Sequence, residues 1–141
     1  ILAEVYLLSP TRHLPDITPI PALPAAITLG EAPEGAVLNL PIVPGRNFLY
    51  EQILHHKPVI GSLNTSINRP GLQVLLAARK LRMEKASLED FVAIAKQWQV
   101  RYIVSHKNVM ASEAFIGATV AISQHYKPLA EDEKLVVYQL W

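Results

Sequence analysis

The sequence contains no cysteine, which leaves the redox compartment open and suits the outside of a cell as well as the cytosol. It also lacks any run approaching the roughly 18 consecutive apolar residues of a membrane-spanning helix. Charge is scarce and balanced: 18% of the residues are charged, and 13 Lys and Arg against 12 Asp and Glu give a formal charge of +1. Because this balance offers no general attraction to nucleic acid, we expect no nucleic-acid partner.

Glycine-rich turns for phosphate binding are also missing. Such a turn should follow the apolar stretch 36–42, because phosphate requires close approach to free backbone N–H groups. The turn contains a single glycine, Gly45, and two prolines, Pro41 and Pro44, which remove donors. Neither a dinucleotide fingerprint nor a P-loop is present, so we expect no nucleotide and assign no cofactor.

Histidines and candidate nucleophiles form no complete catalytic or metal-binding motif. His55 and His56 are adjacent and would point about 100° apart on a helix, so one helix face cannot offer both to one metal ion. We favour one packed and one solvated histidine. Gly61-Ser62 lacks the second glycine of a nucleophile elbow. We therefore assign no catalytic residue and no metal ligand.

Most acidic residues have a structural explanation. Ser87-Leu-Glu-Asp90 predicts a helix start with Asp in place of the usual Glu or Gln of a capping box. Residues 131–133 predict a solvated acidic turn. Among the acids, only Glu4 and Glu51 plainly lack such a structural role.

Hydrophobic residues are abundant and periodically arranged. They make up 50% of the 141 residues, enough for one domain with a sizeable core. Apolar runs of strand length alternate with helical periods from residue 36 onward, which favours an α/β fold. We expect a mostly parallel, Rossmann-like sheet of about four to five strands with flanking helices, in which the last strand can form an antiparallel edge. The expected strands are 4–8, 36–42, 59–60, 100–105 and 135–140, and the expected helices are 48–55, 71–83, 88–98 and 112–124.

The N-terminal region is rich in proline. Five of the eleven prolines lie between residues 10 and 24, and apolar residues between them offer anchors. We predict one domain over 1–141 with 10–34 as a connector packed on it, including one or two helical turns at 25–32; a mobile linker is the alternative. The chain opens directly on an apolar strand, so we expect it to belong to a longer protein.

Polar side chains gather where strand 36–42 ends and the loop 62–69 emerges. Ligands of open α/β sheets bind beyond the carboxyl ends of strands. Two cations, an imidazole and several neutral donors and acceptors suit a hydroxyl-rich or phosphate-bearing ligand. The alternative, and the commoner use of Asn and Ser, is to satisfy loop backbone groups. The candidate ligand-binding residues are Arg46, Asn47, His55, Asn64, Ser66, Asn68 and Arg69.

A basic run occupies Arg79, Lys80, Arg82 and Lys85, interrupted by Glu84. We favour a structural role for this run, because it lies near the C-terminus of a predicted helix, where the helix dipole attracts cations. Attraction to anionic lipid headgroups or phosphates is the alternative.

Several short motifs occur in a characteristic order. They are Gly35-Ala-Val-Leu-Asn-Leu-Pro41, a short helix with aromatic residues, His55-His56-Lys57-Pro58, a polar loop with Arg, Val100-Arg-Tyr-Ile-Val-Ser-His106, and Val137-Tyr138-Gln139-Leu140. This order resembles the C-terminal soluble domain of polytopic bacterial and archaeal membrane proteins of the GT-C glycosyltransferase type.

The resemblance implies a location on the extracytoplasmic face of the cell membrane, after membrane helices of the same chain. In such enzymes the donor is a polyprenyl-phosphate-linked sugar, and the catalytic carboxylate lies in an early loop of the membrane part. The implied function is a non-catalytic accessory domain that positions an acceptor or partner, with lipid headgroups or a glycan acceptor as further contacts. Loop 62–69 holds no aromatic residue, unlike the corresponding loop in other domains of this type. The alternative is a self-contained α/β domain that binds a small sugar or anionic ligand.

Overall fold

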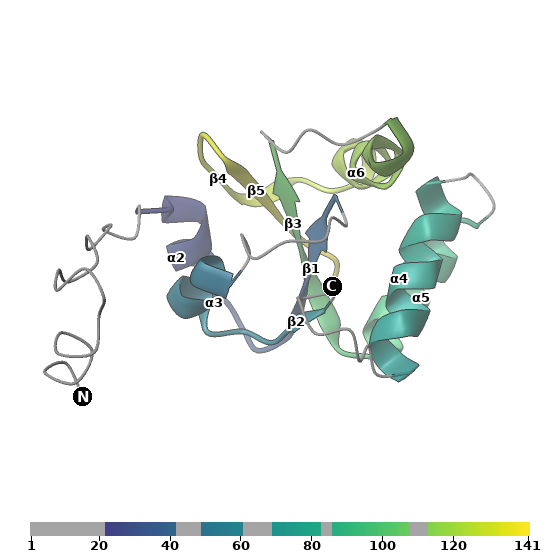
Figure 1. The fold of residues 1–141 in the computed structure, drawn as a ribbon, viewed down its shortest axis with the longest axis horizontal. Coiled ribbons are helices and arrows are strands. Elements are labelled where there is room, and N and C mark those ends of the chain that lie inside the picture. Colours follow the sequence, from purple (N-terminus) through teal and green to yellow (C-terminus); the bar gives the residue numbers. More distant parts are fainter. Residues whose placement is uncertain (1–21, 42–48, 61–68, 83–85, 108–112) are drawn as a thin grey trace, which may run out of the picture.

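The computed structural model describes residues 22–41, 49–60, 69–82, 86–107 and 113–141. Within these ranges, helices and strands alternate along most of the chain (Figure 1). The predicted strand 4–8 lies outside the described residues. The elements are α2 (Pro24–Glu31), β1 (Ala36–Leu40), α3 (Leu49–His55), β2 (Val59–Ile60), α4 (Arg69–Arg82), α5 (Leu88–Gln97), β3 (Val100–His106), α6 (Glu113–His125), β4 (Pro128–Glu131) and β5 (Leu135–Gln139).

The five described strands form one mixed sheet in the order β2-β1-β3-β5-β4. β1 is parallel to β2 and β3, whereas β5 is antiparallel to both β3 and β4. Four of the five strands therefore run in one direction, and β5 runs against them. The predicted α/β class is confirmed, and the sheet is mostly but not wholly parallel.

One detail of the predicted sheet needs correction. The last strand, β5, is antiparallel as expected, but it lies inside the described sheet, and β4 forms the edge beyond it. β4 was not predicted because its four residues, Pro128 to Glu131, begin with a proline and include only two hydrophobic residues, Leu129 and Ala130. A short edge strand with a proline and a charged residue is a common protection against unwanted pairing.

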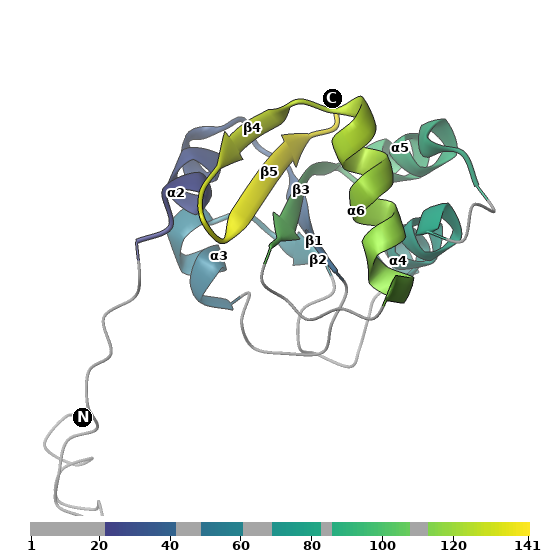
Figure 2. The ribbon, with the colours of Figure 1, turned by 90° about the horizontal axis from the view of Figure 1, so that it is seen from above.

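Helices cover both faces of the sheet (Figures 1 and 2). One core joins α2 to the face of the sheet that carries Val37 and Tyr102, and α3 packs beside α2. The other joins α4, α5 and α6 to the face that carries Leu38 and Ile103. Because β1 and β3 are largely buried on both faces, their sequences are mainly apolar and do not alternate regularly with polar residues.

The helix starts follow local sequence where the sequence provides a cap. Ser87 Oγ accepts a hydrogen bond from the backbone N of Asp90 at 3.1 Å, and Asp90 Oδ2 accepts one from the N of Ser87 at 3.3 Å. This confirms the predicted capping box at the start of α5. None of the described helices combines the length and apolarity needed to cross a membrane.

Candidate functional site

The carboxyl ends of β1 and β3 lie side by side because these strands are parallel neighbours. Asn39 is the one polar residue of β1, and His106 is the last residue of β3. His106 Nε2 lies 3.1 Å from Asn39 Oδ1, across 67 residues of sequence. The tautomer with hydrogen on Nε2 donates to this amide oxygen. The pair is therefore a direct polar link between the ends of two strands.

Helix α3 adds an acid to this pair. Glu51, in the first turn of α3, places Oε2 3.5 Å from His106 Nε2. The side chains of Glu51 and His106 are only 5% and 7% exposed. We call Asn39, Glu51 and His106 the strand-end cluster.

Burial controls the charges of the cluster. Burial, assisted by the charge of Asp132, raises the pKa of Glu51 to about 7. Burial also lowers the pKa of His106 to about 4. At neutral pH the imidazole is therefore neutral, and the carboxyl group is divided between its protonated and ionised forms. Glu51 can donate or accept a hydrogen bond near neutral pH, and His106 offers one donor and one acceptor.

Asn39 brings an unused donor to the cluster. Within the described part of the chain, its Nδ2 is the one buried side-chain nitrogen or oxygen without a hydrogen-bond partner. Leaving such a donor unpaired costs about 1–3 kcal/mol. An acceptor atom, such as a hydroxyl or phosphate oxygen, would remove this cost.

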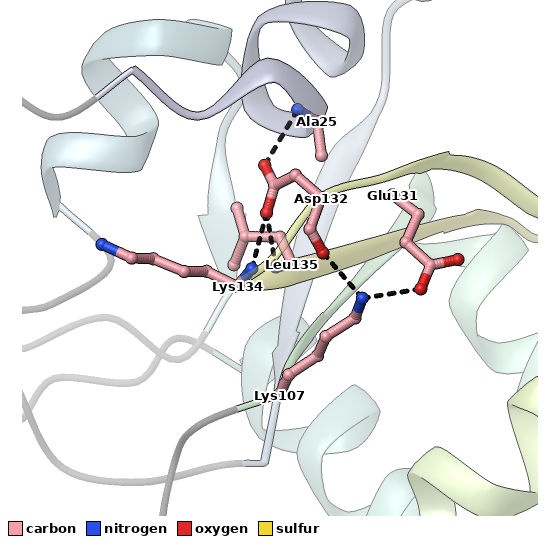
Figure 3. A network of polar contacts seen from close by, with 6 residues as sticks. All are labelled: Ala25, Lys107, Glu131, Asp132, Lys134 and Leu135. Atoms are coloured by element: carbon pink, nitrogen blue, oxygen red, sulfur yellow. Dashed lines mark hydrogen bonds and ion pairs between the residues drawn. The ribbon is translucent and has the colours of Figure 1, made fainter.

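A second polar network begins at Lys107, the residue that follows His106 in the sequence (Figure 3). The Nζ of Lys107 donates to Glu131 Oε1 and to the backbone O of Asp132, each at 2.6 Å. Asp132 Oδ1 accepts from the backbone N of Lys134 and of Leu135, both at 2.8 Å. The network thus ties the end of β3 to the turn between β4 and β5.

Asp132 makes more contacts than the predicted solvated turn at residues 131–133 would give it. Burial opposes its ionisation, but three backbone N–H donors and Lys107 together hold the pKa of its carboxyl group below the usual value. The interpretation of residues 131–133 as a merely solvated turn is therefore corrected for Asp132. Its negative charge also contributes to the raised pKa of Glu51.

The His55-His56-Lys57-Pro58 motif forms a structural turn after α3. Lys57 is 3% exposed, and its Nζ donates to the backbone O of Ala32 at 2.8 Å and of Pro33 at 3.1 Å. The same Nζ lies 5.5 Å from the centre of the Tyr102 ring, a distance that allows a cation–π interaction. Tyr102 Oη also donates to Pro33 O at 2.7 Å. The motif therefore holds the segment after α2 against β3.

His55 is the one predicted site residue whose side chain the structure describes. It is 2% exposed, and its Nδ1 accepts a hydrogen bond from the N of Lys57 at 3.0 Å. Burial, followed by the charges of Lys57 and His56, lowers its pKa to about 4. His55 thus stays neutral and serves as an acceptor within its own turn.

The other predicted ligand-binding residues remain a prediction. Arg69 is described only as the first residue of α4. Arg46, Asn47, Asn64, Ser66 and Asn68 lie outside the described residues.

Asn39 and His106 were not among the predicted site residues. A polar residue inside the apolar run 37–40 and a histidine at the end of a strand were the available signals. Glu51 was noted only as an acid without a structural role.

Among the described residues, no group of three or more His, Asp and Glu side chains is arranged to hold a metal ion. Comparison of the chain with protein-family models, with curated proteins and with solved structures gives no significant match.

Proposed function

We propose that this chain is a non-catalytic accessory domain of a membrane glycosyltransferase-like protein, on the extracytoplasmic face of the cell membrane. In this proposal it follows membrane helices of the same chain and positions a glycan acceptor or a partner, without contacting nucleic acid. The finer description of the sheet as Rossmann-like belongs to the same proposal. It is supported by the parallel unit β2-β1-β3 with helices on both faces.

The supporting observation is that the sequence motifs behind the resemblance contact one another. The motif at Gly35–Pro41 supplies Asn39 and the motif at Val100–His106 supplies His106, whose side chains meet at 3.1 Å. The His-His-Lys-Pro motif supplies Lys57, which lies over Tyr102 of the Val100–His106 motif. Motifs far apart in the sequence thus build one scaffold, and the strand-end cluster lies at its carboxyl edge.

The chemistry of this edge suits a hydroxyl-rich ligand. Asn39 offers an unpartnered amide donor, and Glu51 can donate or accept according to its protonation. A sugar hydroxyl both donates and accepts hydrogen bonds, so it matches this combination. Parallel strands commonly present ligand-binding residues at this edge.

The proposal is tested in the longer protein by Glu51→Gln, which keeps the size of the side chain and removes its charge. We expect less glycan on the acceptor, measured by mass spectrometry of cell-surface glycans, while the domain stays folded. Arg46→Ala combined with Arg69→Ala tests the predicted polar loop in the same assay. Normal glycan levels in both folded variants would refute a role of this edge in positioning the acceptor.

The absence of catalysis is tested separately with the purified chain and a polyprenyl-phosphate-linked sugar. We expect no sugar transfer and no hydrolysis. Turnover that Glu51→Gln abolishes would show that the chain is an enzyme.

A self-contained domain that binds a small sugar or anionic ligand is the second candidate, favoured by the unpartnered Nδ2 of Asn39. Titration of the purified chain with monosaccharides and with inorganic phosphate, followed by NMR, separates the two. Saturable shifts of the Asn39 side-chain amide, together with unchanged glycosylation in the cell assay, would favour this candidate.

A further inference from the structure

Helix α4 has one buried face and one exposed face. Successive residues of an α-helix are about 100° apart, so residues three, four and seven apart share a face. Val74, Ala77, Ala78 and Leu81 are buried against the rest of the domain. The opposite face carries Leu72 and Leu76, one turn apart and each 46% exposed.

Cations flank these two leucines. Arg79 and Lys80 are exposed and lie within one helical turn of Leu76. The sequence of α4 contains no Asp or Glu. The helix dipole accounts for cations near the helix C-terminus, but it does not account for two exposed leucines beside them. Exposed leucines next to a cationic, acid-free surface are typical of helices that lie in a membrane interface.

The apolar surface continues beside Leu76. An open groove of about 560 Å³ lies between α4 and α5, and its apolar lining includes Leu76, Phe91 and Ile94. Asp90 is the acid that lines it. The carboxylate of Asp90 is engaged at the start of α5, where Oδ2 lies 2.9 Å from Ser87 Oγ. The groove therefore extends the apolar surface, with its one acid already hydrogen-bonded.

We propose that the exposed face of α4 docks on an anionic bilayer, with Leu72 and Leu76 entering the boundary between headgroups and acyl chains and Arg79 and Lys80 contacting lipid phosphates. An anionic bilayer is the partner we propose, because its charge is opposite to that of the cationic, acid-free surface of α4. A second copy of the chain would place the acid-free surface of α4 against itself, and like charges would repel. This proposal depends on the surface of α4 alone and does not require the function proposed above.

Binding to vesicles provides the first test. The 141-residue chain is mixed with vesicles of phosphatidylcholine, with or without phosphatidylglycerol, and bound protein is measured by flotation. We expect binding that requires phosphatidylglycerol and weakens with added salt. Each cation near an anionic surface contributes about fivefold, so Arg79→Gln with Lys80→Gln should lower the partition coefficient roughly 30-fold.

A matched variant controls for total charge. Lys127→Gln with Lys134→Gln removes two exposed cations outside α4, and we expect vesicle binding to stay within a few-fold of the unmodified chain. An equal loss in both variants would refute docking through α4. Binding to neither kind of vesicle would refute it as well, as would selective binding to an acidic protein surface in place of vesicles.

Tryptophan fluorescence gives an independent readout of the docking face. Trp98 Nε1 donates to Gln73 Oε1 of α4 at 2.8 Å, and Trp141 is the other tryptophan of the chain. With phosphatidylglycerol vesicles that contain brominated lipid, we expect quenching of Trp98 in Trp141→Phe and weaker quenching of Trp141 in Trp98→Phe. The reverse order would place a different face on the membrane.

The leucines are tested against exposed apolar residues elsewhere. Leu72→Ser with Leu76→Ser should abolish the quenching of Trp98, whereas Ile27→Ser with Ile53→Ser should preserve it. Ile27 and Ile53 are 46% and 56% exposed and lie on α2 and α3. Circular dichroism melts confirm that each variant is folded. Equal effects of the two pairs would contradict docking through α4.

Discussion

Asp132 Oδ2 accepts a hydrogen bond from the backbone N of Ala25 at 3.1 Å, across 107 residues of sequence (Figure 3). Ala25 lies in the first turn of α2, whose own N-cap residue, Leu23, has no side-chain acceptor. A distant carboxylate therefore satisfies a helix N-terminus that the local sequence leaves open. Asp132 thereby attaches α2 to the turn between β4 and β5.

Removal of this carboxylate should destabilise the domain. We expect Asp132→Ala to lower the free energy of unfolding by about 1–3 kcal/mol, because three backbone donors lose their acceptor. Urea denaturation measures the change. Glu133→Ala, at an exposed position of the same turn, should change it by less than about 0.5 kcal/mol. Equal effects of the two substitutions would contradict the capping role of Asp132.

The same carboxylate should give the domain an acid-sensitive component of stability. Its pKa is lower in the folded chain than the usual value of 3.8. Its contribution is therefore fully present above that value and is lost as pH falls through the folded pKa. Asp132→Asn should be less sensitive to pH in the acid range than the unmodified chain, as measured by thermal melts. Identical acid sensitivity of the two proteins would contradict this assignment.

Local sequence predicted much of the fold but not its long-range polar contacts. The buried strand at 36–40 and the capped helix at 88–97 were predictable because apolar periodicity and an N-cap lie within a few residues. β4 carries neither signal, and it exists because β5 offers it a partner. The Asp132 contact and the burial of Lys57 depend on residues far away in the sequence. Local patterns do not contain that information.

The same distinction applies to the site. The sequence predicted a polar edge where strand 36–42 ends and loop 62–69 emerges, and that edge stays a prediction. The residues that the structure brings together, Asn39, Glu51 and His106, are a different set. Their pairing was not predictable, because it requires the register of β1 against β3 and a position of α3 that brings Glu51 to the end of β3. Of the predicted site residues, only the side chain of His55 belongs to the described part of the chain.

Buried Lys57 should be required for stability. Lys57→Met keeps much of the aliphatic volume but removes the donor to Ala32 O and Pro33 O and the contact with the Tyr102 ring. We expect a loss of at least about 2 kcal/mol in the free energy of unfolding, because hydrogen bonds from charged groups are the stronger ones. Lys127→Met, at an exposed position, is the control in the same urea denaturation experiment. A small and equal change in both variants would show that the buried ammonium group contributes little.

Glu51 should make the stability of the domain depend on pH near neutrality. The pKa of Glu51 is raised from 4.5 to about 7, so between these values the folded chain holds a proton that the unfolded chain releases. Stability from this group therefore falls as pH rises through that window. Glu51→Gln removes the effect, and we expect it to gain roughly 1–3 kcal/mol relative to the unmodified chain between about pH 5 and about pH 8. Denaturation curves with a difference that is independent of pH would contradict the raised pKa.

Asn39 allows a test that separates ligand recognition from stability. Asn39→Leu keeps the branching of the side chain, removes the unpartnered Nδ2 and also removes the acceptor that lies 3.1 Å from His106. The gain from eliminating an unpaired buried donor offsets the loss of one hydrogen bond, so we expect the free energy of unfolding to change by less than about 1 kcal/mol. If Nδ2 contacts the glycan acceptor of the proposed membrane glycosyltransferase-like protein, the same substitution in that protein should reduce cell-surface glycan. Normal glycan levels with unchanged stability would exclude Asn39 from acceptor recognition and leave it as a structural link between β1 and β3.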